Sequence, residues 1–329
     1  MHTQPSNMKA LMYLGIGELK LQEVKAPEGE FIVKVLGSGI CGTDLKCYLK
    51  GHHMFKPPTI LGHELYGNVC KAPENCGFKL GDIVVVAPYV ECGQCKICKT
   101  SPGELCKSKS YIDSGAFCEY ISIPLDYLDK GVFKVESEDD VYTLVEPLAC
   151  VLNGIEHLKI NPYSKVLVVG SGPMGALFAL TFKARGIPVA VVEPSETRRN
   201  LVSSWGIECF EPGKFDASGF DNVVVAVNKA ELIDEYVRKV DDEGTVLVFS
   251  GLKKEESLNL DSYSIHYREV TVTGSFGYAM KHFREALELI KCHKDVFSKV
   301  ITHKFPLEKG KEAFDMLKEA EALKVILKP

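Results

Sequence analysis

Short apolar runs separated by turn residues make up the first part of the chain. After Phe31 they read FIVKVLG, NVCKA, DIVVVAPYV and FCEYISIP, and glycine, proline or charged residues bound them. Runs of four to eight residues rich in valine, isoleucine and aromatic residues predict strands. We therefore expect an irregular, mostly β domain over residues 1–150.

The pattern changes after residue 151. KVLVV, PVAVVEP, DNVVVAV and GTVLVFSG alternate with helical patterns such as ETRRNLVSSWG and KAELIDEYVRKV. Nearly continuous apolar strands between helices predict a parallel, doubly wound sheet with helices on both faces. We expect this α/β domain over residues 151–284, with IHYREVTVTGSF as a late strand. A chain of 329 residues suffices for two cores. We expect residues 285–329 to return to the first domain.

A glycine-rich turn, Gly170-Ser171-Gly172-Pro173-Met174-Gly175, follows KVLVV and opens a helix. In this setting glycines allow a tight turn, close approach to a pyrophosphate and close helix–strand packing, and the helix N-terminus faces the phosphates. Without its context, the motif is equally consistent with a purely structural turn.

Glu193 ends the second strand of the same unit. An acid at this place usually holds the ribose hydroxyls of NAD and repels a 2′-phosphate. The alternative is a solvated charge at a strand end. Arg198 and Arg199 can accept a 2′-phosphate or stack on adenine, so NAD is favoured and NADP stays open.

The stretch CGQCKICKTSPGELC gathers four cysteines at 92, 95, 98 and 106. Four thiolates at such spacing can surround one tetrahedral Zn²⁺ in a closed, structural site. Two disulfides are the alternative, but seven further cysteines scattered singly indicate reduced intracellular thiols. A nucleic-acid-binding zinc ribbon is disfavoured by the net charge of −5.

The same charge, with both signs mixed along the chain, argues against any nucleic-acid partner. No run approaches the roughly 20 apolar residues that span a bilayer, and no signal peptide is visible at the amino terminus. We expect a cytoplasmic protein without a membrane partner.

A second, open metal site is offered by three separated segments. They carry Cys41 in GICGTD, His63 and Glu64 in GHELYG, and Glu146 in LVEPLAC. A thiolate, an imidazole and carboxylates leave a position on Zn²⁺ for water or substrate, as catalytic sites require. Taken alone, a histidine in a glycine-bounded turn is more often a hydrogen-bonded structural residue.

These motifs, in this order and ahead of GSGPMG, resemble those of the zinc-dependent medium-chain alcohol dehydrogenases from about Met8 to Pro329. The sorbitol (polyol) and threonine dehydrogenase branch is most similar, and EPLAC favours the polyol enzymes. The resemblance implies a Rossmann domain, a GroES-like catalytic domain, one catalytic zinc and one structural zinc.

The resemblance also assigns roles to single residues. Cys41, His63 and Glu64 are expected to ligate zinc, with Glu146 beside the metal or bound to it through water, while Thr43 relays a proton and Asp44 orders the turn. Tyr278 matches a substrate-side tyrosine. The residues expected to contact the cofactor are Gly170, Gly172, Pro173, Met174, Gly175, Glu193, Arg198, Gly251, Leu252, Ser275 and Phe276.

Three positions depart from the family pattern. Lys46 stands where a histidine is common, Gly277 replaces an arginine of many polyol enzymes, and KSKSYIDS after Cys106 is short. The reaction class is unaffected, whereas substrate recognition must differ.

The expected activity is reversible oxidation of a secondary alcohol, in a polyol or sugar, to a ketone with NAD(P). An amino-alcohol such as threonine, aldehyde reduction, or a non-catalytic cofactor-sensing role are the alternatives. We expect a homodimer or homotetramer, with VTVTGSF near an edge used for pairing.

Overall fold

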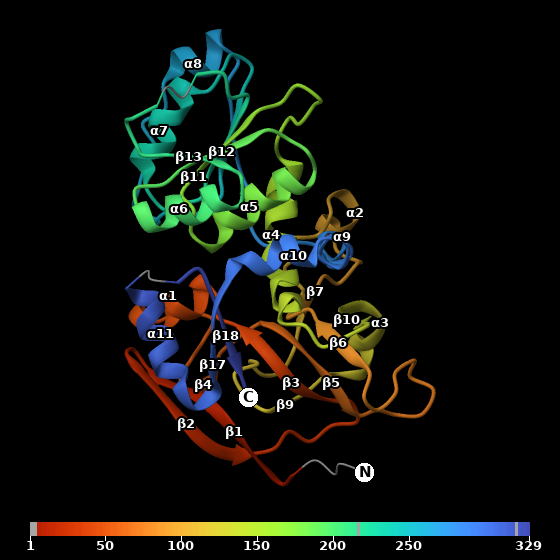
Figure 1. Ribbon diagram of the computed structural model, residues 1–329. Helices are drawn as coiled ribbons and strands as arrows, with labels where there is room; N and C mark the ends of the chain where they lie inside the picture. Colours follow the sequence, from red (N-terminus) through yellow and green to blue (C-terminus); the bar gives the residue numbers. More distant parts are fainter. Residues whose placement is uncertain (1–4, 216–217, 320–321) are drawn as a thin grey trace. The chain divides into compact units, whose positions relative to one another are not determined.

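The computed structural model describes residues 5–215, 218–319 and 322–329. The chain forms two compact units (Figure 1): Met1–Pro147 with Ala279–Pro329, and Leu148–Tyr278. The expected boundaries after residues 150 and 284 differ from these by a few residues. As a result, α9 (Met280–Cys292) lies wholly in the first unit.

The first unit is built on short, mostly antiparallel strands. A three-stranded sheet contains β2 (Glu18–Lys25), β1 (Asn7–Gly15) and β4 (Thr59–Ile60), and a small ribbon pairs β7 (Tyr89–Val90) with β8 (Ser110–Tyr111). The larger sheet has the order β10 (Val132–Val135), β6 (Ile83–Val86), β5 (Glu64–Lys71), β3 (Ile32–Gly39), β18 (Lys324–Lys328) and β17 (Ile301–Pro306), with β9 (Tyr120–Ser122) also paired to β3.

The predicted β domain is thus confirmed, but the β1–β2 hairpin was not among the predicted strands. Its strands carry alternating buried and exposed side chains rather than continuous apolar runs, a pattern typical of half-buried strands.

Two helices from distant parts of the chain lie side by side in this unit, α1 (Gly42–Lys50) and α11 (Gly310–Lys318) (Figure 1). The Tyr48 and Phe314 rings pack edge to face with their centroids 5.4 Å apart, and the centroids of the Phe117 and Phe314 rings are 6.0 Å apart. Aromatic pairs in this geometry add to the apolar burial of a core. This core fixes the turn that joins β3 to α1.

Shorter helical segments complete the first unit. They are α2 (Lys96–Thr100), α3 (Leu128–Gly131), α10 (Lys294–Phe297) and the 3₁₀ turns η1 (Leu125–Tyr127), η2 (Asp140–Leu144), η3 (Ser298–Val300) and η4 (Leu307–Lys309).

The second unit has one fully parallel sheet, as predicted. Its strand order is β13 (Glu208–Phe210), β12 (Val189–Val192), β11 (Val166–Val169), β14 (Asn222–Val225), β15 (Thr245–Val248) and β16 (Thr271–Gly274). Its helices are α4 (Val145–Glu156, which starts in the first unit), α5 (Pro173–Ala184), α6 (Glu196–Ser204), α7 (Ala230–Lys239) and α8 (Ser262–Tyr267). The strand order changes direction at β11. Sheets of this kind bind dinucleotides at the carboxyl ends of the strands beside such a point.

One predicted strand is partly wrong. Ile265–Tyr267, expected as the start of a strand, lie in α8, and only Thr271–Gly274 are extended. The Asp261 side chain accepts hydrogen bonds from the Ser264 N–H at 2.9 Å and the Ser264 hydroxyl at 2.7 Å. This N-cap favours a helix over the β-propensity of isoleucine and tyrosine.

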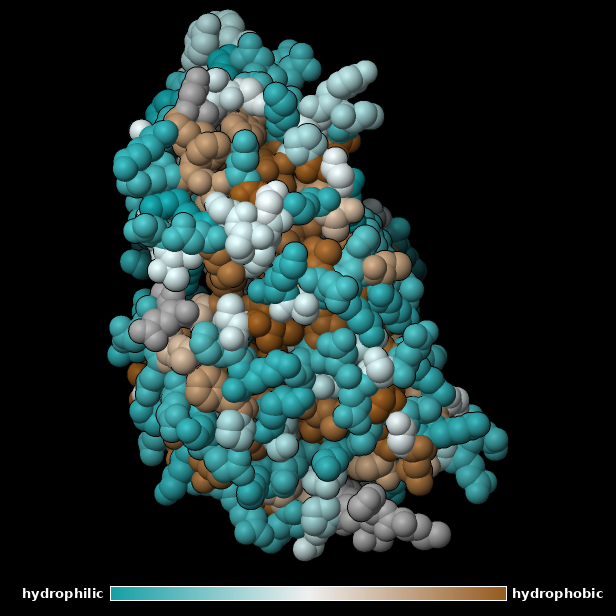
Figure 2. Space-filling model, in the orientation of Figure 1, coloured by the Kyte–Doolittle hydropathy of each residue, from teal (hydrophilic) through white to brown (hydrophobic). Residues whose placement is uncertain are grey.

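Hydrophilic side chains cover most of the surface visible on each unit in Figure 2. Among the described residues, no helix combines the length and apolar character needed to cross a bilayer.

Candidate functional site

Cys41 is the N-cap of α1, directly after β3. The Cys41 N–H donates to Asp44 Oδ2 at 3.0 Å, and Cys41 Sγ accepts from the Thr43 N–H at 3.5 Å. Backbone donors at a helix N-terminus stabilise a thiolate. The turn therefore holds the sulfur in place beside the start of α1.

His63 follows a turn that only glycine fits. Gly62 has a φ of 97°, and a Cβ there would lie 2.6 Å from the Phe117 ring. The Gly62 N–H donates to Asp44 Oδ1 at 3.2 Å, and His63 Nδ1 lies 3.5 Å from the same oxygen. The fully buried Asp44 thus joins the cysteine turn to the histidine turn.

These turns bring three predicted ligands together. One ligand atom each from Cys41, His63 and Glu64 lies within 4.8 Å of the other two. Burial disfavours a charged imidazole, but Asp44 and Cys41 outweigh it and hold the pKa of His63 well above its usual range. The surroundings of His63 therefore favour positive charge at this point of the site.

Glu64 is also engaged by a residue that the sequence analysis missed. Lys324 Nζ donates to both carboxylate oxygens at 2.7 Å, and to the Ile40 carbonyl at 3.2 Å. Both side chains are buried. The pair leaves little space, because a Cβ on Gly39 would lie 2.1 Å from Glu64 Oε2. A lysine inside the apolar closing run ALKVIL was the available sequence signal, since buried lysines need a partner.

Glu146 lies near the start of α4 and is buried. Burial, together with the negative charges of Glu64 and Asp44, raises its pKa to about 7, although His63 and Lys324 oppose the shift. Glu146 lies outside the tight three-residue group, but these charges act on it. A cysteine sulfur, an imidazole and carboxylates gathered in one largely enclosed group fit a divalent cation, and this donor set suits zinc.

The four clustered cysteines converge on one point. Sγ–Sγ distances are 3.5 Å for Cys92–Cys106 and Cys95–Cys98, 3.8 Å for Cys95–Cys106 and 3.9 Å for Cys92–Cys98. A tetrahedron with Zn–S bonds of about 2.3 Å has edges of about 3.8 Å. All four thiols are free, so the disulfide alternative is wrong and the cluster has the dimensions of a closed zinc site.

The segment with the four clustered cysteines, residues 92–106, is linked to α9 by a neighbouring side chain. Glu91, which precedes Cys92, accepts the Met280 N–H at 3.2 Å with each carboxylate oxygen. A carboxylate at a helix N-terminus satisfies a free backbone donor and favours the helix dipole. Folding of this segment thus also anchors α9.

The glycine turn has the features expected of a phosphate-binding loop. A Cβ on Gly175 would lie 1.9 Å from the Gly170 carbonyl oxygen, so α5 packs tightly against the strand end. A Cβ on Gly172 would meet nothing within 4 Å, which leaves the side above the turn open. Pro173 is the first residue of α5, where its missing N–H has no cost, and Met174 follows in the same first turn.

Glu193 is buried at the end of β12 and braces two turns. Its Oε2 accepts from the Ser171 N–H at 2.8 Å and the Ser171 hydroxyl at 3.0 Å, and Oε1 accepts from the Ser195 N–H at 2.9 Å. A carboxylate has about four acceptor positions, so one is left for a further donor. Ser195 caps α6 through the Arg198 N–H.

The other predicted cofactor residues share this edge of the sheet. Gly251 and Leu252 follow β15, and Ser275 and Phe276 follow β16. Since all strands are parallel, their carboxyl ends lie on the same side as the glycine turn. Phe276 is 74% exposed, whereas Tyr278 is fully buried, and its substrate role stays a prediction.

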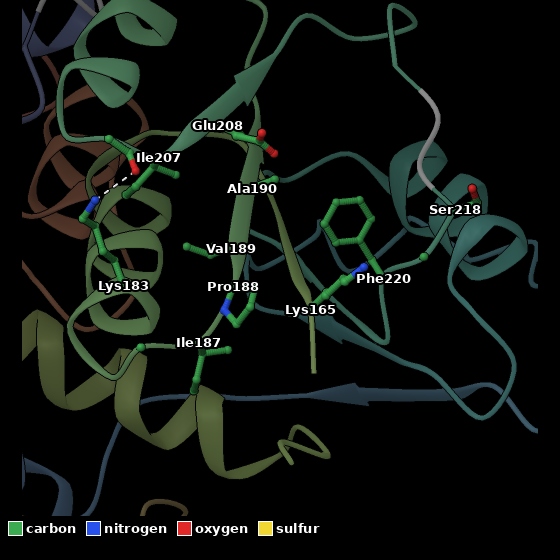
Figure 3. A pocket seen from close by; sticks show the side chains of 13 residues that line it. Lys165, Lys183, Ile187, Pro188, Val189, Ala190, Ile207, Glu208, Ser218 and Phe220 are labelled. Atoms are coloured by element: carbon green, nitrogen blue, oxygen red, sulfur yellow. Dashed lines mark hydrogen bonds between the residues drawn. The ribbon is translucent and has the colours of Figure 1, made fainter. Parts of the chain in front are cut away.

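A pocket of about 580 Å³ lies at the opposite edge of that sheet (Figure 3). It is lined by Lys165, Lys183, Pro188 and Phe220 among others, and Lys183 Nζ donates to the Gly206 carbonyl at 2.9 Å. Lys165 and Pro188 precede β11 and β12. The pocket is therefore at the amino ends of the strands, away from the edge that binds dinucleotides in such folds.

Comparisons with known proteins agree with this arrangement. The family model of the alcohol dehydrogenase GroES-like domain matches residues 27–134, and that of the glucose dehydrogenase C-terminus matches residues 139–328, more than half of the chain. The chain belongs to the zinc-dependent medium-chain alcohol dehydrogenases. The predicted fold class, a Rossmann domain with a GroES-like domain, is thereby confirmed.

Several relatives of this dehydrogenase match over nearly their full length. D-altritol 5-dehydrogenase of Agrobacterium fabrum is 30% identical over 91% of this chain and 93% of its own. L-galactonate-5-dehydrogenase of Escherichia coli is 29% identical over 94% of each chain. L-threonine 3-dehydrogenase of Pyrococcus furiosus is 30% identical over 93% and 94%. A zinc-binding dehydrogenase from Sinorhizobium meliloti, solved with NADP, has 26% identity and a TM-score of 0.86, covering 99% of this chain and 100% of its own.

Metal content tests the two metal sites of this dehydrogenase. We expect two zinc ions per chain by elemental analysis, one for each cluster, and one in Cys41→Ser, which should lose turnover while keeping its circular dichroism spectrum. Cys292→Ser, at an exposed cysteine of α9, is the matched control and should retain both ions. Unchanged zinc and turnover in Cys41→Ser would contradict the assignment.

Removal of Lys324 tests the buried ion pair. Lys324→Met leaves Glu64 without its counter-charge, and the free energy of unfolding should fall by about 3–5 kcal/mol. Urea denaturation measures this loss. The double variant Lys324→Met/Glu64→Gln should recover part of it, because no buried charge is then unpaired. A loss below about 1 kcal/mol in the single variant would mean that the pair does not exist in solution.

Proposed function

We propose that this dehydrogenase reversibly oxidises a secondary alcohol of a polyol or sugar to the ketone, with NAD as the hydride acceptor. The observation that carries the proposal is the convergence of Cys41, His63 and Glu64 from separate segments into one group whose ligand atoms lie within 4.8 Å of one another. The open glycine turn beside Glu193 supports the choice of cofactor.

The relatives support the class of alcohol. D-altritol 5-dehydrogenase and L-galactonate-5-dehydrogenase are named for position 5 of molecules with hydroxyl groups along a carbon chain. Such positions carry a secondary hydroxyl with polar neighbours. An acid, Glu146, beside the proposed metal rather than a second cysteine suits a site that handles several hydroxyl groups.

In the proposed mechanism, Cys41 and His63 would hold the catalytic zinc, and Glu64 or Glu146 would complete the anionic side of the site. When bound, zinc serves as a Lewis acid that lowers the pKa of an alcohol. Asp44 keeps both ligand-bearing turns in register through its bonds to the Cys41 and Gly62 N–H groups. Lys324 neutralises Glu64 and so limits the negative charge around the metal.

Oxidation removes a hydride from carbon and a proton from oxygen. When bound, NAD would supply the acceptor for the hydride. We assign the relay of this proton to Thr43 Oγ1, which would accept it while giving up its own proton, because Thr43 follows Cys41 by two residues in the first turn of α1 and is partly exposed. Lys46 lies one turn further along this helix and is exposed, so the proton can pass from Thr43 to solvent on that side.

The environment of Glu193 favours NAD over NADP. Three donors hold its carboxylate in place, and one remaining acceptor position can take a ribose hydroxyl. A 2′-phosphate would face this fixed negative charge. Arg199 Nη1 is already engaged, because it donates to the Glu193 and Pro194 carbonyls at 2.9 and 2.5 Å.

An amino-alcohol is the second candidate substrate. The match to L-threonine 3-dehydrogenase is as close in identity as that to D-altritol 5-dehydrogenase. Oxidation of a polyol and oxidation of an amino-alcohol would use the same residues proposed above. Only the shape and polarity of the substrate pocket would distinguish the two substrates.

A substrate panel tests the proposal. NADH formation, followed at 340 nm with polyols, sugar acids, aldoses and L-threonine, should be greatest for a polyol or sugar acid with a secondary hydroxyl. Pre-incubation with a zinc chelator should abolish it. The ratio of kcat/KM for NAD to that for NADP should be at least about tenfold, which corresponds to about 1.4 kcal/mol.

If L-threonine were the best substrate, the proposed substrate class would be an amino-alcohol instead of a polyol. Chelator-resistant turnover would contradict the zinc mechanism, and equal use of NADP would contradict the role given to Glu193. A protein with two zinc ions and no turnover on any alcohol would favour a non-catalytic, cofactor-sensing role.

We also propose that the enzyme is a cytoplasmic homodimer or homotetramer. β16 pairs with β15 on one side and with no described strand on the other, so a second copy could extend the sheet there. All twelve cysteines are free thiols, as in a reducing compartment. Sedimentation velocity should give the mass of two or four chains, and a single-chain mass at micromolar concentration would contradict the proposal.

A further inference from the structure

Asn153 is a buried amide on α4 that serves one short turn of the second unit. Its Nδ2 lies 3.1 Å from the Ser275 hydroxyl oxygen, 3.4 Å from the Phe276 carbonyl and 3.0 Å from the Gly277 carbonyl. Its exposure is 2%. All three acceptors belong to consecutive residues that lie 122 to 124 positions away in the sequence.

The turn has few other reasons to keep one conformation. Gly277 has a φ of 64°, which glycine adopts readily in either hand, and the Phe276 side chain is 74% exposed. A buried amide facing three acceptors can hold such a turn, because breaking these bonds leaves the buried Asn153 amide unsatisfied. Asn153 therefore selects the conformation of residues 275–277.

The position of this turn gives the constraint a function. The turn follows β16, the sixth strand of the order β13-β12-β11-β14-β15-β16. A dinucleotide with its pyrophosphate at the glycine turn after β11 extends its adenine half over β12 and β13, next to Glu193. The nicotinamide half then lies over β14 to β16, where the turn is.

We propose that Asn153 is a positioning residue for the nicotinamide half of the cofactor, which it holds by fixing the turn at residues 275–277. This inference rests on the proposed function, in which NAD is the cofactor. Asn153 occupies the carbonyl oxygens of Phe276 and Gly277. The turn then presents its backbone N–H groups and the exposed Phe276 ring in one arrangement.

A comparison of NADH with ADP-ribose tests the proposal, because ADP-ribose lacks only the nicotinamide ring. Asn153→Asp keeps the size of the side chain but turns its donors into a carboxylate that faces three oxygens. The Kd for NADH, measured by fluorescence titration of the zinc-loaded protein, should rise about tenfold. The Kd for ADP-ribose, measured by calorimetry, should stay within about twofold of the wild-type value.

Asn153→Ala removes the donors without adding charge, so it should show the same selectivity with a smaller rise in the NADH Kd. It also serves as the test if Asn153→Asp fails to fold. Asn222→Asp is the matched control. Asn222 is equally buried and bonds the backbone of Lys159 at 3.2 and 3.3 Å, but it lies at the amino end of β14. This control should lower the melting temperature and leave the ratio of the two Kd values unchanged.

Two results would overturn the inference: an unchanged NADH Kd in both Asn153 variants, or an equal rise for NADH and ADP-ribose, which would show a general structural role. Failure of NAD as the cofactor, the part of the proposed function on which this inference rests, looks different, because the wild-type protein would then bind neither ligand.

Discussion

The buried carboxylate of Asp44 is the group on which the geometry of the metal site depends. It accepts from the Cys41 N–H, accepts from the Gly62 N–H and lies 3.5 Å from His63. Cys41 and His63 are therefore placed by one side chain rather than by two independent loops. A buried carboxylate without these donors would be costly, so the turns and Asp44 stabilise one another. The site is held ready before any metal arrives.

Charge balance is the second constraint on this unit. Cys41, Asp44, Glu64 and Glu146 bring several acidic groups into a small, largely buried region, and Lys324 supplies a fixed positive charge from the last strand. Burial, with the charges of Glu64 and Asp44, raises the pKa of Glu146, and the charges of Asp44 and Cys41 raise the pKa of His63. A divalent cation satisfies this excess of acidic groups, which explains why one unit combines metal binding with so many buried ionisable groups.

In the second unit, buried polar side chains hold the turns by bonding their backbone groups. Glu193 ties the glycine turn to the turn that starts α6 through Ser171 and Ser195, and Asn153 fixes the turn after β16. All these turns follow the carboxyl ends of parallel strands. Rigid strands with turns held by buried polar side chains form a defined surface for a long, flexible dinucleotide.

The sequence by itself determined the parallel sheet, the cluster of four cysteines and the segments that carry Cys41, His63 and Glu146. It could do so because apolar periodicity, glycine turns and local cysteine spacing are properties of neighbouring residues. It did not determine the pairing of Lys324 with Glu64, the bonds from Asn153 to residues 275–277, or the helix at Ile265–Tyr267. The first two join residues 260 and more than 120 positions apart, and a side-chain cap overrode local propensity in the third. Only the tertiary structure decided them, since burial creates the need for a partner and the fold decides which residue is within reach.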